Sequence, residues 1–308
     1  MITKLTDNSV PQPATWKIVL KLPALLLWIG VGGPVCGLAT MVCRWLKQRP
    51  PANLYRKFHL GMAALFQIKT RIVGQICPEL NTLFVVNHAS YLDVFVLGSK
   101  INGSFIAKSE VASWPVFGKL AGIQSTLFLT RKSTRAASQV EQLAARLAQG
   151  PMILFPEGTS TPGGLVEPFR SSLFAAAAEY EGVVPKIQPV TIAYTHYASK
   201  PMTQIQRDRY AWYLPMKFAP HFLAALGLSS ARARVQFHPP VTLNDFPSRK
   251  ACAAACEAKV RSGLLEALGQ TTETCPAGYR ALSRRWQRLQ RELVESPDRS
   301  IHQTATLH

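Results

Sequence analysis

An uncharged apolar run near the N-terminus places the strongest constraint on how this chain can fold. The run extends from Leu22 to Cys43 and contains no Asp, Glu, Lys or Arg. As a helix it would be about 33 Å long, enough to cross the hydrocarbon core of a bilayer. Pro23, Pro34 and a cluster of glycines interrupt it, which also suits a kinked pair of helices lying in one leaflet. The sequence therefore predicts a membrane helix or helical hairpin within residues 1–50 and leaves both arrangements open.

The next 210 or so residues show an alternation of short apolar strands with helical patterns. One predicted helix covers Thr134–Gln149, and another covers residues 249–268. Alternation of this kind predicts an α/β fold with a mostly parallel sheet flanked by helices. We therefore divide the chain into an anchoring segment at 1–50, a globular domain at 51–268 and a C-terminal segment at 269–308. The last of these comprises a linker, a basic amphipathic helix at Tyr279–Glu295 and a disordered tail. The arginines of that helix face either an anionic membrane or solvent.

The richest chemical motif follows the apolar strand Leu83–Val86. Asn87 and His88 follow this strand, and Asp93 lies five residues after His88, in what reads as the first turn of a helix. A carboxylate beside a histidine fixes its tautomer and stabilises the imidazolium, which equips the histidine as a general base. Ser90 and Asp93 also match a capping box, which needs no catalysis. The eight residues 86–93 alone leave both interpretations open.

Two further strand ends carry polar groups. The strand Met152–Leu154 leads into Phe-Pro-Glu-Gly-Thr-Ser at 155–160, a turn with free backbone N–H groups of the kind that can hold an anion. Glu157 suits a hydroxyl or a neighbouring group better than an anion. The strand Leu127–Leu129 leads to Arg131 and Lys132, and an arginine fork suits an oxyanion. An ordinary turn and a solvated basic loop are the respective alternatives.

In this order the motifs resemble the PlsC-like family of glycerolipid acyltransferases. That family shows an N-H-x4-D block, a strand ending in Arg, an F-P-E-G-[TS] block and a short hydrophobic-Pro block. Their counterparts here are Asn87-His88…Asp93, Phe128…Arg131, Phe155–Thr159 and Gln188-Pro189-Val190. The resemblance covers roughly residues 55–245. Ser125 and Thr130 depart from the Gly and Asp of many members, so the second block is the weakest match.

The resemblance implies an enzyme that moves an acyl group from a thioester to a lysolipid hydroxyl, with no cofactor and no metal. It makes His88 the general base and Asp93 its partner. Arg131 and Lys132 would bind the acceptor phosphate, and Glu157, Gly158 and Thr159 would shape the acceptor site. The donor is acyl-CoA or acyl-carrier protein. The first choice of acceptor is 1-acyl-sn-glycerol-3-phosphate, giving phosphatidic acid; lyso-ornithine lipid is the alternative. An apolar tunnel for the acyl chain is expected, but the sequence does not identify its lining.

Charge and cysteine content bear on location and partners. The formal net charge is +18, which indicates an anionic partner, and a hydrophobic content of 47% favours a membrane surface over nucleic acid. The remaining hypothesis is a non-enzymatic protein that binds membranes or nucleic acid through its basic surface. Under this hypothesis the two specific motifs, His88–Asp93 and Phe155–Thr159, would occur by coincidence. Six cysteines form neither a disulfide framework nor a zinc pattern. With basic residues after the apolar run, we predict the inner membrane, with the catalytic domain on the cytoplasmic face.

Overall fold

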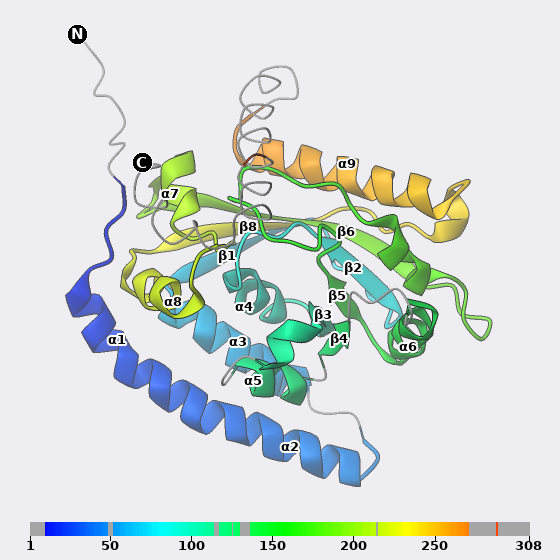
Figure 1. The fold of residues 1–308 in the computed structure, drawn as a ribbon, viewed down its shortest axis with the longest axis horizontal. Helices are drawn as coiled ribbons and strands as arrows, with labels where there is room; N and C mark the ends of the chain where they lie inside the picture. The colour runs from blue at the N-terminus through cyan, green and yellow to red at the C-terminus, as the bar shows by residue number, and fades with distance from the viewer. Residues whose placement is uncertain are drawn as a thin grey trace.

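The computed structural model describes residues 10–48, 52–113, 117–124, 126–129, 136–213, 215–270 and residue 288. The described strands form one sheet in the order β1-β8-β6-β2-β5-β3-β4, with the short β7 paired to β6 (Figure 1). Their bounds are β1 Ile68–Val73, β2 Thr82–Val86, β3 Ser104–Lys108, β4 Leu127–Leu129, β5 Met152–Leu154, β6 Lys186–Tyr197, β7 Lys200–Pro201 and β8 Ala231–Phe237.

Most strand pairs in this sheet are parallel. Strand β2 runs parallel to β5 on one side and to β6 on the other, and β3 runs parallel to both β4 and β5. Strand β8 is antiparallel to β6 but parallel to β1. The predicted α/β fold with a mostly parallel sheet is confirmed. The central β2 is buried along its whole length, as expected of a parallel strand covered on both faces.

Helices cover both faces of the sheet. They are α1 Thr15–Leu27, α2 Gly33–Trp45, α3 Ala52–Leu65, α4 Leu92–Gly98, α5 Phe117–Ile123, α6 Ala136–Gln149, α7 Gln204–Asp208, α8 Phe218–Gly227 and α9 Arg249–Ala267. One apolar core joins the sheet to α3, α4 and α8, and a second joins the other face to α6 and α9. Helices α6 and α9 confirm the two helices predicted from periodicity, within the described residues. The predicted helix at 279–295 lies outside the described residues, apart from Arg288.

The N-terminal apolar run forms one long helix and not two separate ones. Helices α1 and α2 join through a π-helical turn at Trp28–Gly32 to give a continuous helix, Thr15–Trp45, long and apolar enough to cross a membrane. Figure 1 shows this helix curving along the base of the domain, beneath α3 and α5. The Trp28 indole donates a hydrogen bond to the carbonyl of Phe58 at 3.1 Å, and its ring packs directly against Gly61. The helix is therefore docked onto the domain along one side.

Candidate active site

The site is built where the central strand β2 ends. Asn87 follows the strand and is fully buried. Its amide oxygen accepts a hydrogen bond from the backbone N–H of Ile192 at 2.8 Å, and its amide nitrogen donates one to the carbonyl of the same residue at 2.9 Å. This pair of bonds fixes the end of β2 against β6. The next residue, His88, is thereby held in place on a rigid frame.

His88 and Asp93 are in direct contact. The Nδ1 of His88 donates a hydrogen bond to Oδ2 of Asp93 at 2.9 Å, which leaves Nε2 as the acceptor nitrogen of the neutral ring. The His88 side chain is 19% exposed and that of Asp93 is 0% exposed. Phe155 stacks on the imidazole, with ring centroids 4.0 Å apart and planes inclined by 20°. The ring is therefore fixed in tautomer and in orientation, and still reaches solvent.

The carboxylate of Asp93 accepts three more hydrogen bonds. Its Oδ2 accepts from the backbone N–H groups of Ala89 at 2.8 Å and Ser90 at 2.9 Å, and its Oδ1 accepts from the Tyr194 hydroxyl at 2.9 Å. The two interpretations of Ser90-x-x-Asp93 are therefore compatible, because one carboxylate closes the helix start and also holds the histidine. Sequence reasoning missed Tyr194, which lies 101 residues away from Asp93 along the chain.

The Phe155–Ser160 turn packs against the backbone of His88. Glu157 is buried, and its two carboxylate oxygens accept from the backbone N–H groups of His88 at 2.6 Å and Glu167 at 2.7 Å. Burial raises the pKa of Glu157 well above its usual value, and these two hydrogen bonds oppose the rise. Thr161 donates from its backbone N–H to the His88 carbonyl at 2.9 Å. Of the two roles considered for Glu157, this geometry matches the orientation of a neighbouring group.

Cations near this turn are the other predicted part of the site. Arg131 and Lys132 lie outside the described residues. Gly158 adopts a φ of +67°, and a Cβ built on it would lie 2.8 Å from the Cζ of Arg170. The Arg170 guanidinium therefore lies over this glycine, and a side chain at this position would have to displace it. Thr159 points its hydroxyl at the Ser160 carbonyl, at 3.4 Å.

In the described part of the chain, no cluster of three or more His, Cys, Asp or Glu side chains is placed to hold a metal ion.

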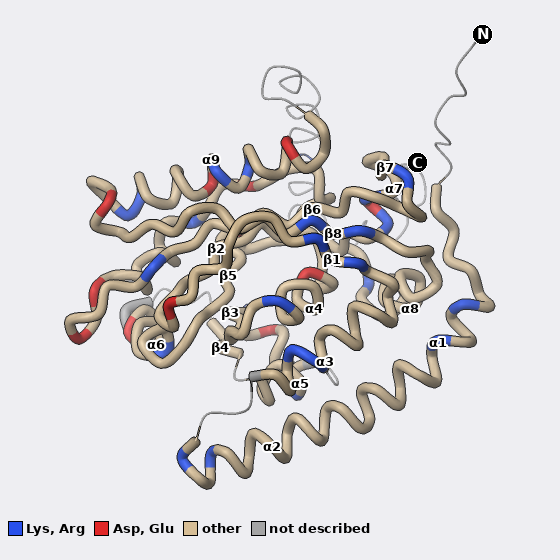
Figure 2. The backbone as a smooth tube through the Cα atoms, turned by 180° about the vertical axis from the view of Figure 1, so that it is seen from behind, with Lys and Arg blue, Asp and Glu red and all other residues tan. Residues whose placement is uncertain are grey.

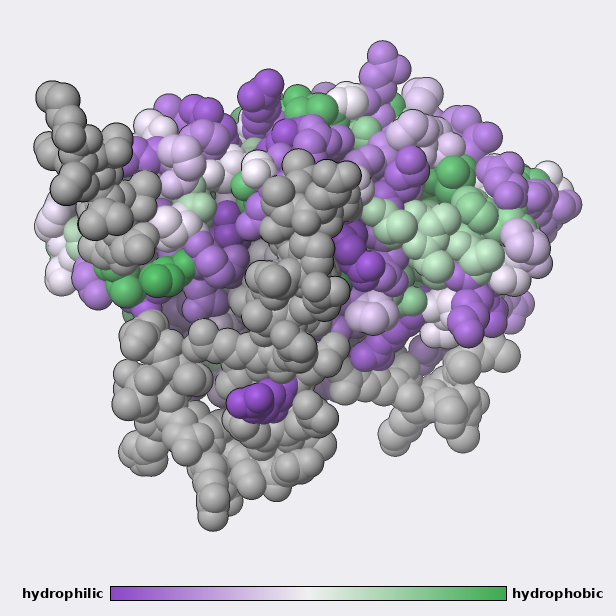
Figure 3. All heavy atoms as spheres, turned by 90° about the horizontal axis from the view of Figure 1, so that it is seen from above, coloured by the Kyte–Doolittle hydropathy of each residue, from purple (hydrophilic) through white to green (hydrophobic). Residues whose placement is uncertain are grey.

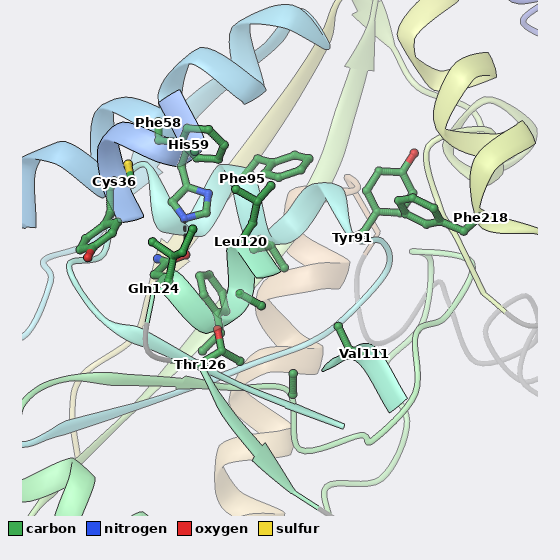
Figure 4. Close-up of a pocket in the computed structure, with 17 residues that line it drawn as sticks. Cys36, Phe58, His59, Tyr91, Phe95, Val111, Leu120, Gln124, Thr126 and Phe218 are labelled. Atoms are coloured by element: carbon green, nitrogen blue, oxygen red, sulfur yellow. Dashed lines mark hydrogen bonds between the residues drawn. The ribbon is translucent and has the colours of Figure 1, made fainter. Parts of the chain in front are cut away.

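An apolar pocket lies beyond the aromatic ring that stacks on His88. Phe155 also stacks on Phe105, with ring centroids 6.4 Å apart, and Phe105 is part of the pocket wall. The cavity measures about 140 Å³ and is lined by residues of α2, α3, α4, β3, α5 and α8, including Gly33, Cys36, Phe58, His59, Phe95, Leu120, Gln124 and Phe218 (Figure 4). The lining could not be read from the sequence because it comes from seven separate elements, including the 3₁₀ helix Ser109–Ser113 that supplies Val111.

Comparison with known proteins places this arrangement in a family. The Acyltransferase family model matches residues 67–193. A lyso-ornithine lipid O-acyltransferase of Rhodobacter capsulatus is 44% identical over 204 residues, which are 65% of this chain and 72% of that protein. A Rhizobium meliloti protein of the same name is 32% identical over 77% of this chain and 84% of the relative. A 1-acyl-sn-glycerol-3-phosphate acyltransferase of Neisseria gonorrhoeae is 34% identical over 39% of this chain and 49% of the relative.

A solved structure shares the fold. The 1-acyl-sn-glycerophosphate acyltransferase PlsC of Thermotoga maritima superposes with a TM-score of 0.56 and 22% sequence identity, covering 82% of this chain and 94% of that one. At this level of identity the likeness concerns the fold alone. The sequence relatives support assignment to a family and not only to a fold, since the Rhodobacter capsulatus protein matches over most of its length. The chain is thus an enzyme of the PlsC-like acyltransferase family, whose members act on lysolipid acceptors.

Proposed function

We propose that the protein transfers an acyl group from a thioester to the free hydroxyl of lyso-ornithine lipid, with His88 as general base. The observation that carries the choice of acceptor is the 44% identity to the Rhodobacter capsulatus lyso-ornithine lipid O-acyltransferase over 72% of that protein. The proposal reverses the order of the two acceptors expected from the sequence. Lysophosphatidate remains the second candidate, favoured by the shorter match to the Neisseria gonorrhoeae enzyme.

The proposed reaction uses the free nitrogen of His88. The acceptor hydroxyl gives its proton to Nε2 while its oxygen attacks the thioester carbonyl carbon. The imidazolium that forms is stabilised by Asp93, which already accepts from Nδ1 at 2.9 Å. The tetrahedral intermediate then collapses, the C–S bond breaks, and the leaving thiolate takes the proton back from Nε2. No covalent acyl-enzyme is required, so the catalytic assignment is limited to His88 and Asp93.

Donors for the tetrahedral oxyanion must come from outside the first residues of the 88–93 turn. The backbone N–H of His88 donates to Glu157, and those of Ala89 and Ser90 donate to Asp93. These three groups are therefore already used, so this part of the turn does not supply the oxyanion hole. The Gly158 N–H is used as well, because it donates to the Phe155 carbonyl at 3.1 Å. We therefore assign that role to the backbone N–H of Thr159, in the turn that Glu157 ties to the His88 backbone.

The anionic part of the acceptor head group requires a cation near these turns. Arg131 and Lys132 keep this role as a proposal. Arg170 joins them because its guanidinium lies against Gly158, next to the residue that holds the His88 backbone. An arginine fork pairs with a carboxylate as readily as with a phosphate, so this cation is compatible with both acceptors. The acyl chain would occupy the apolar pocket that begins at Phe105.

The docked N-terminal helix supports membrane binding through one leaflet. Its outward side carries a row of exposed apolar residues: Trp16, Val19, Leu20, Leu26, Leu27, Val31, Val35, Leu38, Met41, Val42 and Trp45. Figure 2 shows basic residues at its two ends and none between them. The opposite side of the molecule, above α9, is largely hydrophilic in its described part (Figure 3). A helix held along the domain and apolar on its free side suits insertion parallel to the membrane surface.

We place the protein at the inner membrane, with residues 51–268 as an acyltransferase domain on the cytoplasmic face. Because apolar burial is not screened by salt, full-length protein should stay with washed membranes at high salt. Release of full-length protein by salt would contradict insertion of the helix. A variant with Leu20, Leu27 and Leu38 changed to Ser tests the exposed row directly. The control is Leu25→Ser, because Leu25 lies on the same helix but is 2% exposed and faces the domain.

The acceptor assay decides between the two lysolipids. Purified full-length protein in mixed micelles is given lyso-ornithine lipid or lysophosphatidate, with each of acyl-CoA and acyl-carrier protein as donor. The proposal expects the larger kcat/KM with lyso-ornithine lipid. A larger value with lysophosphatidate would make the second candidate the correct one. Lipid binding without transfer in every arm would favour the non-enzymatic alternative.

A further inference from the structure

The wall of the apolar pocket includes a hydrogen-bonded pair made of a buried histidine and a half-buried glutamine. His59 points from α3 into the pocket toward Gln124, at the end of α5 (Figure 4). Its Nε2 lies 2.7 Å from the Gln124 amide oxygen, and the whole residue is only 4% exposed. The rings of Phe58, Phe95 and Phe105 surround the imidazole, with centroids 6.0, 6.2 and 6.1 Å away. A polar pair in such surroundings is costly unless every polar atom has a partner.

One atom of this pair has no partner in the described residues. Because the Gln124 oxygen can only accept, Nε2 carries the proton and Nδ1 presents a lone pair. That Nδ1 atom is buried and makes no hydrogen bond in the described residues. Burial lowers the pKa of His59 to about 4, so the ring is neutral and Nδ1 remains an acceptor at neutral pH. Within the described residues, the pocket wall therefore includes a buried acceptor, Nδ1 of His59, that makes no hydrogen bond.

We propose that His59 and Gln124 select an acyl chain that carries a hydroxyl group. The proposal rests on the function proposed above, in which this pocket holds an acyl chain. A hydroxyl would donate to Nδ1 of His59 and satisfy it, while Gln124 keeps the ring in the required tautomer. A plain methylene leaves the lone pair unpaired, and a keto group, which only accepts, does not fit. A site built for a hydrogen bond discriminates against the analogue that lacks it.

The position of His59 places that hydroxyl away from the reacting carbonyl. Three ring contacts separate the two histidines: His88 to Phe155 at 4.0 Å, Phe155 to Phe105 at 6.4 Å and Phe105 to His59 at 6.1 Å. A chain whose carboxyl carbon lies at His88 would therefore meet His59 with its middle part. The donor thioester and the acceptor lysolipid both bring an acyl chain. The shared chemistry is a mid-chain hydroxyl, and separate assay arms distinguish its source.

The test measures a selectivity ratio in full-length protein. In the donor arm, stearoyl-CoA competes with hydroxystearoyl-CoA isomers that carry the hydroxyl at successive mid-chain positions. In the acceptor arm, lysolipids with and without a mid-chain hydroxyl compete for a plain donor. We expect one isomer in one arm to be favoured by about fivefold to tenfold in kcat/KM, as one neutral hydrogen bond allows. His59→Phe should bring that ratio to about one. The control Phe95→Leu reshapes the same wall without a polar atom and should keep the ratio.

The remaining outcomes are equally decisive. Equal kcat/KM for plain and hydroxylated chains in both arms of the wild-type protein would overturn the proposal, as would an unchanged ratio in His59→Phe. If His59→Phe does not fold, Gln124→Leu should lower the ratio because the tautomer is no longer fixed. The ¹⁵N resonance of His59 Nδ1 in the wild-type protein should shift with hydroxystearate and not with stearate. Absence of transfer with every chain would instead reject the proposed function, while leaving the ¹⁵N result interpretable.

Discussion

Two histidines in this protein meet very different surroundings, one in the turn after β2 and one in the apolar pocket. His88 pairs with a carboxylate, contacts solvent and keeps Nε2 available to a substrate. His59 pairs with a neutral amide, is buried among aromatic rings and keeps Nδ1 available. The carboxylate favours the imidazolium that a general base must become, whereas burial beside an amide opposes it. The partner of the ring therefore decides whether a histidine moves a proton or only accepts a hydrogen bond.

Removing the imidazole of His88 tests the first half of this comparison and should have the largest effect. We expect His88→Ala to lower kcat by about 10²–10⁴-fold, the usual contribution of general-base catalysis. Steady-state kinetics of the purified variant check this, with thermal unfolding to show that the fold is intact. His59→Ala is the matched change in the other region and should cost stability more than turnover. Near wild-type turnover in His88→Ala would contradict the role of His88.

Changing Asp93 to Asn separates its two functions. The asparagine can still accept from the Ala89 and Ser90 backbone, but its amide does not stabilise an imidazolium. We expect kcat to fall by about 10²–10³-fold while the melting temperature changes little. The control is Ser90→Ala, which removes only the 3.3 Å hydrogen bond from the Leu92 N–H to the Ser90 hydroxyl. A loss of activity in proportion to a loss of stability would mean that Asp93 serves the helix start alone.

The sequence predicted the parts of the site that are local in the chain. His88, Ser90 and Asp93 lie within six residues at the end of a buried strand, so strand and cap patterns alone place them together. The turn at Glu157 could also be predicted, because β5 ends beside β2 in a parallel sheet and carries its turn to the same edge. What Glu157 contacts could not be predicted, since its partners are backbone N–H groups of His88 and Glu167.

The parts that depend on tertiary packing were beyond the sequence. Tyr194 is recognisable only as a residue of a strand, and its contact with Asp93 depends on the pairing of β6 with β2. The uncharged N-terminal run predicted a helix of sufficient length, but not that the helix lies along the domain. Periodicity also shows which side of a helix is apolar without showing that a cavity remains between helices, so the pocket around His59 was not predicted.

A smaller effect should follow from removing the Tyr194 hydroxyl, which acts on His88 through Asp93. Tyr194→Phe deletes one of the four hydrogen bonds that hold the carboxylate in position, so Asp93 orients the His88 ring less firmly. We expect kcat to fall by about threefold to tenfold. The fall should appear in kcat and not in KM, because Tyr194 acts on the orientation of the base. The control Tyr210→Phe removes a hydroxyl that donates to the Ser229 carbonyl at 2.6 Å and should leave kcat unchanged.

The smallest effect concerns the dependence of stability on pH, and it tests the second half of the comparison. Burial lowers the pKa of His59 from 6.5 in the unfolded chain to about 4. Between these values the unfolded chain binds the proton of His59 more readily, so the contribution of His59 to stability falls as the pH drops from about 6.5 to about 4. His59→Phe should remove this contribution, whereas that of His221, whose pKa burial also lowers to about 4, should remain. Melting temperatures measured across this range in detergent provide the test. The neighbouring change Phe58→Leu should lower the whole curve without changing its slope, and parallel curves for wild type and His59→Phe would show that His59 is not held neutral in the folded protein.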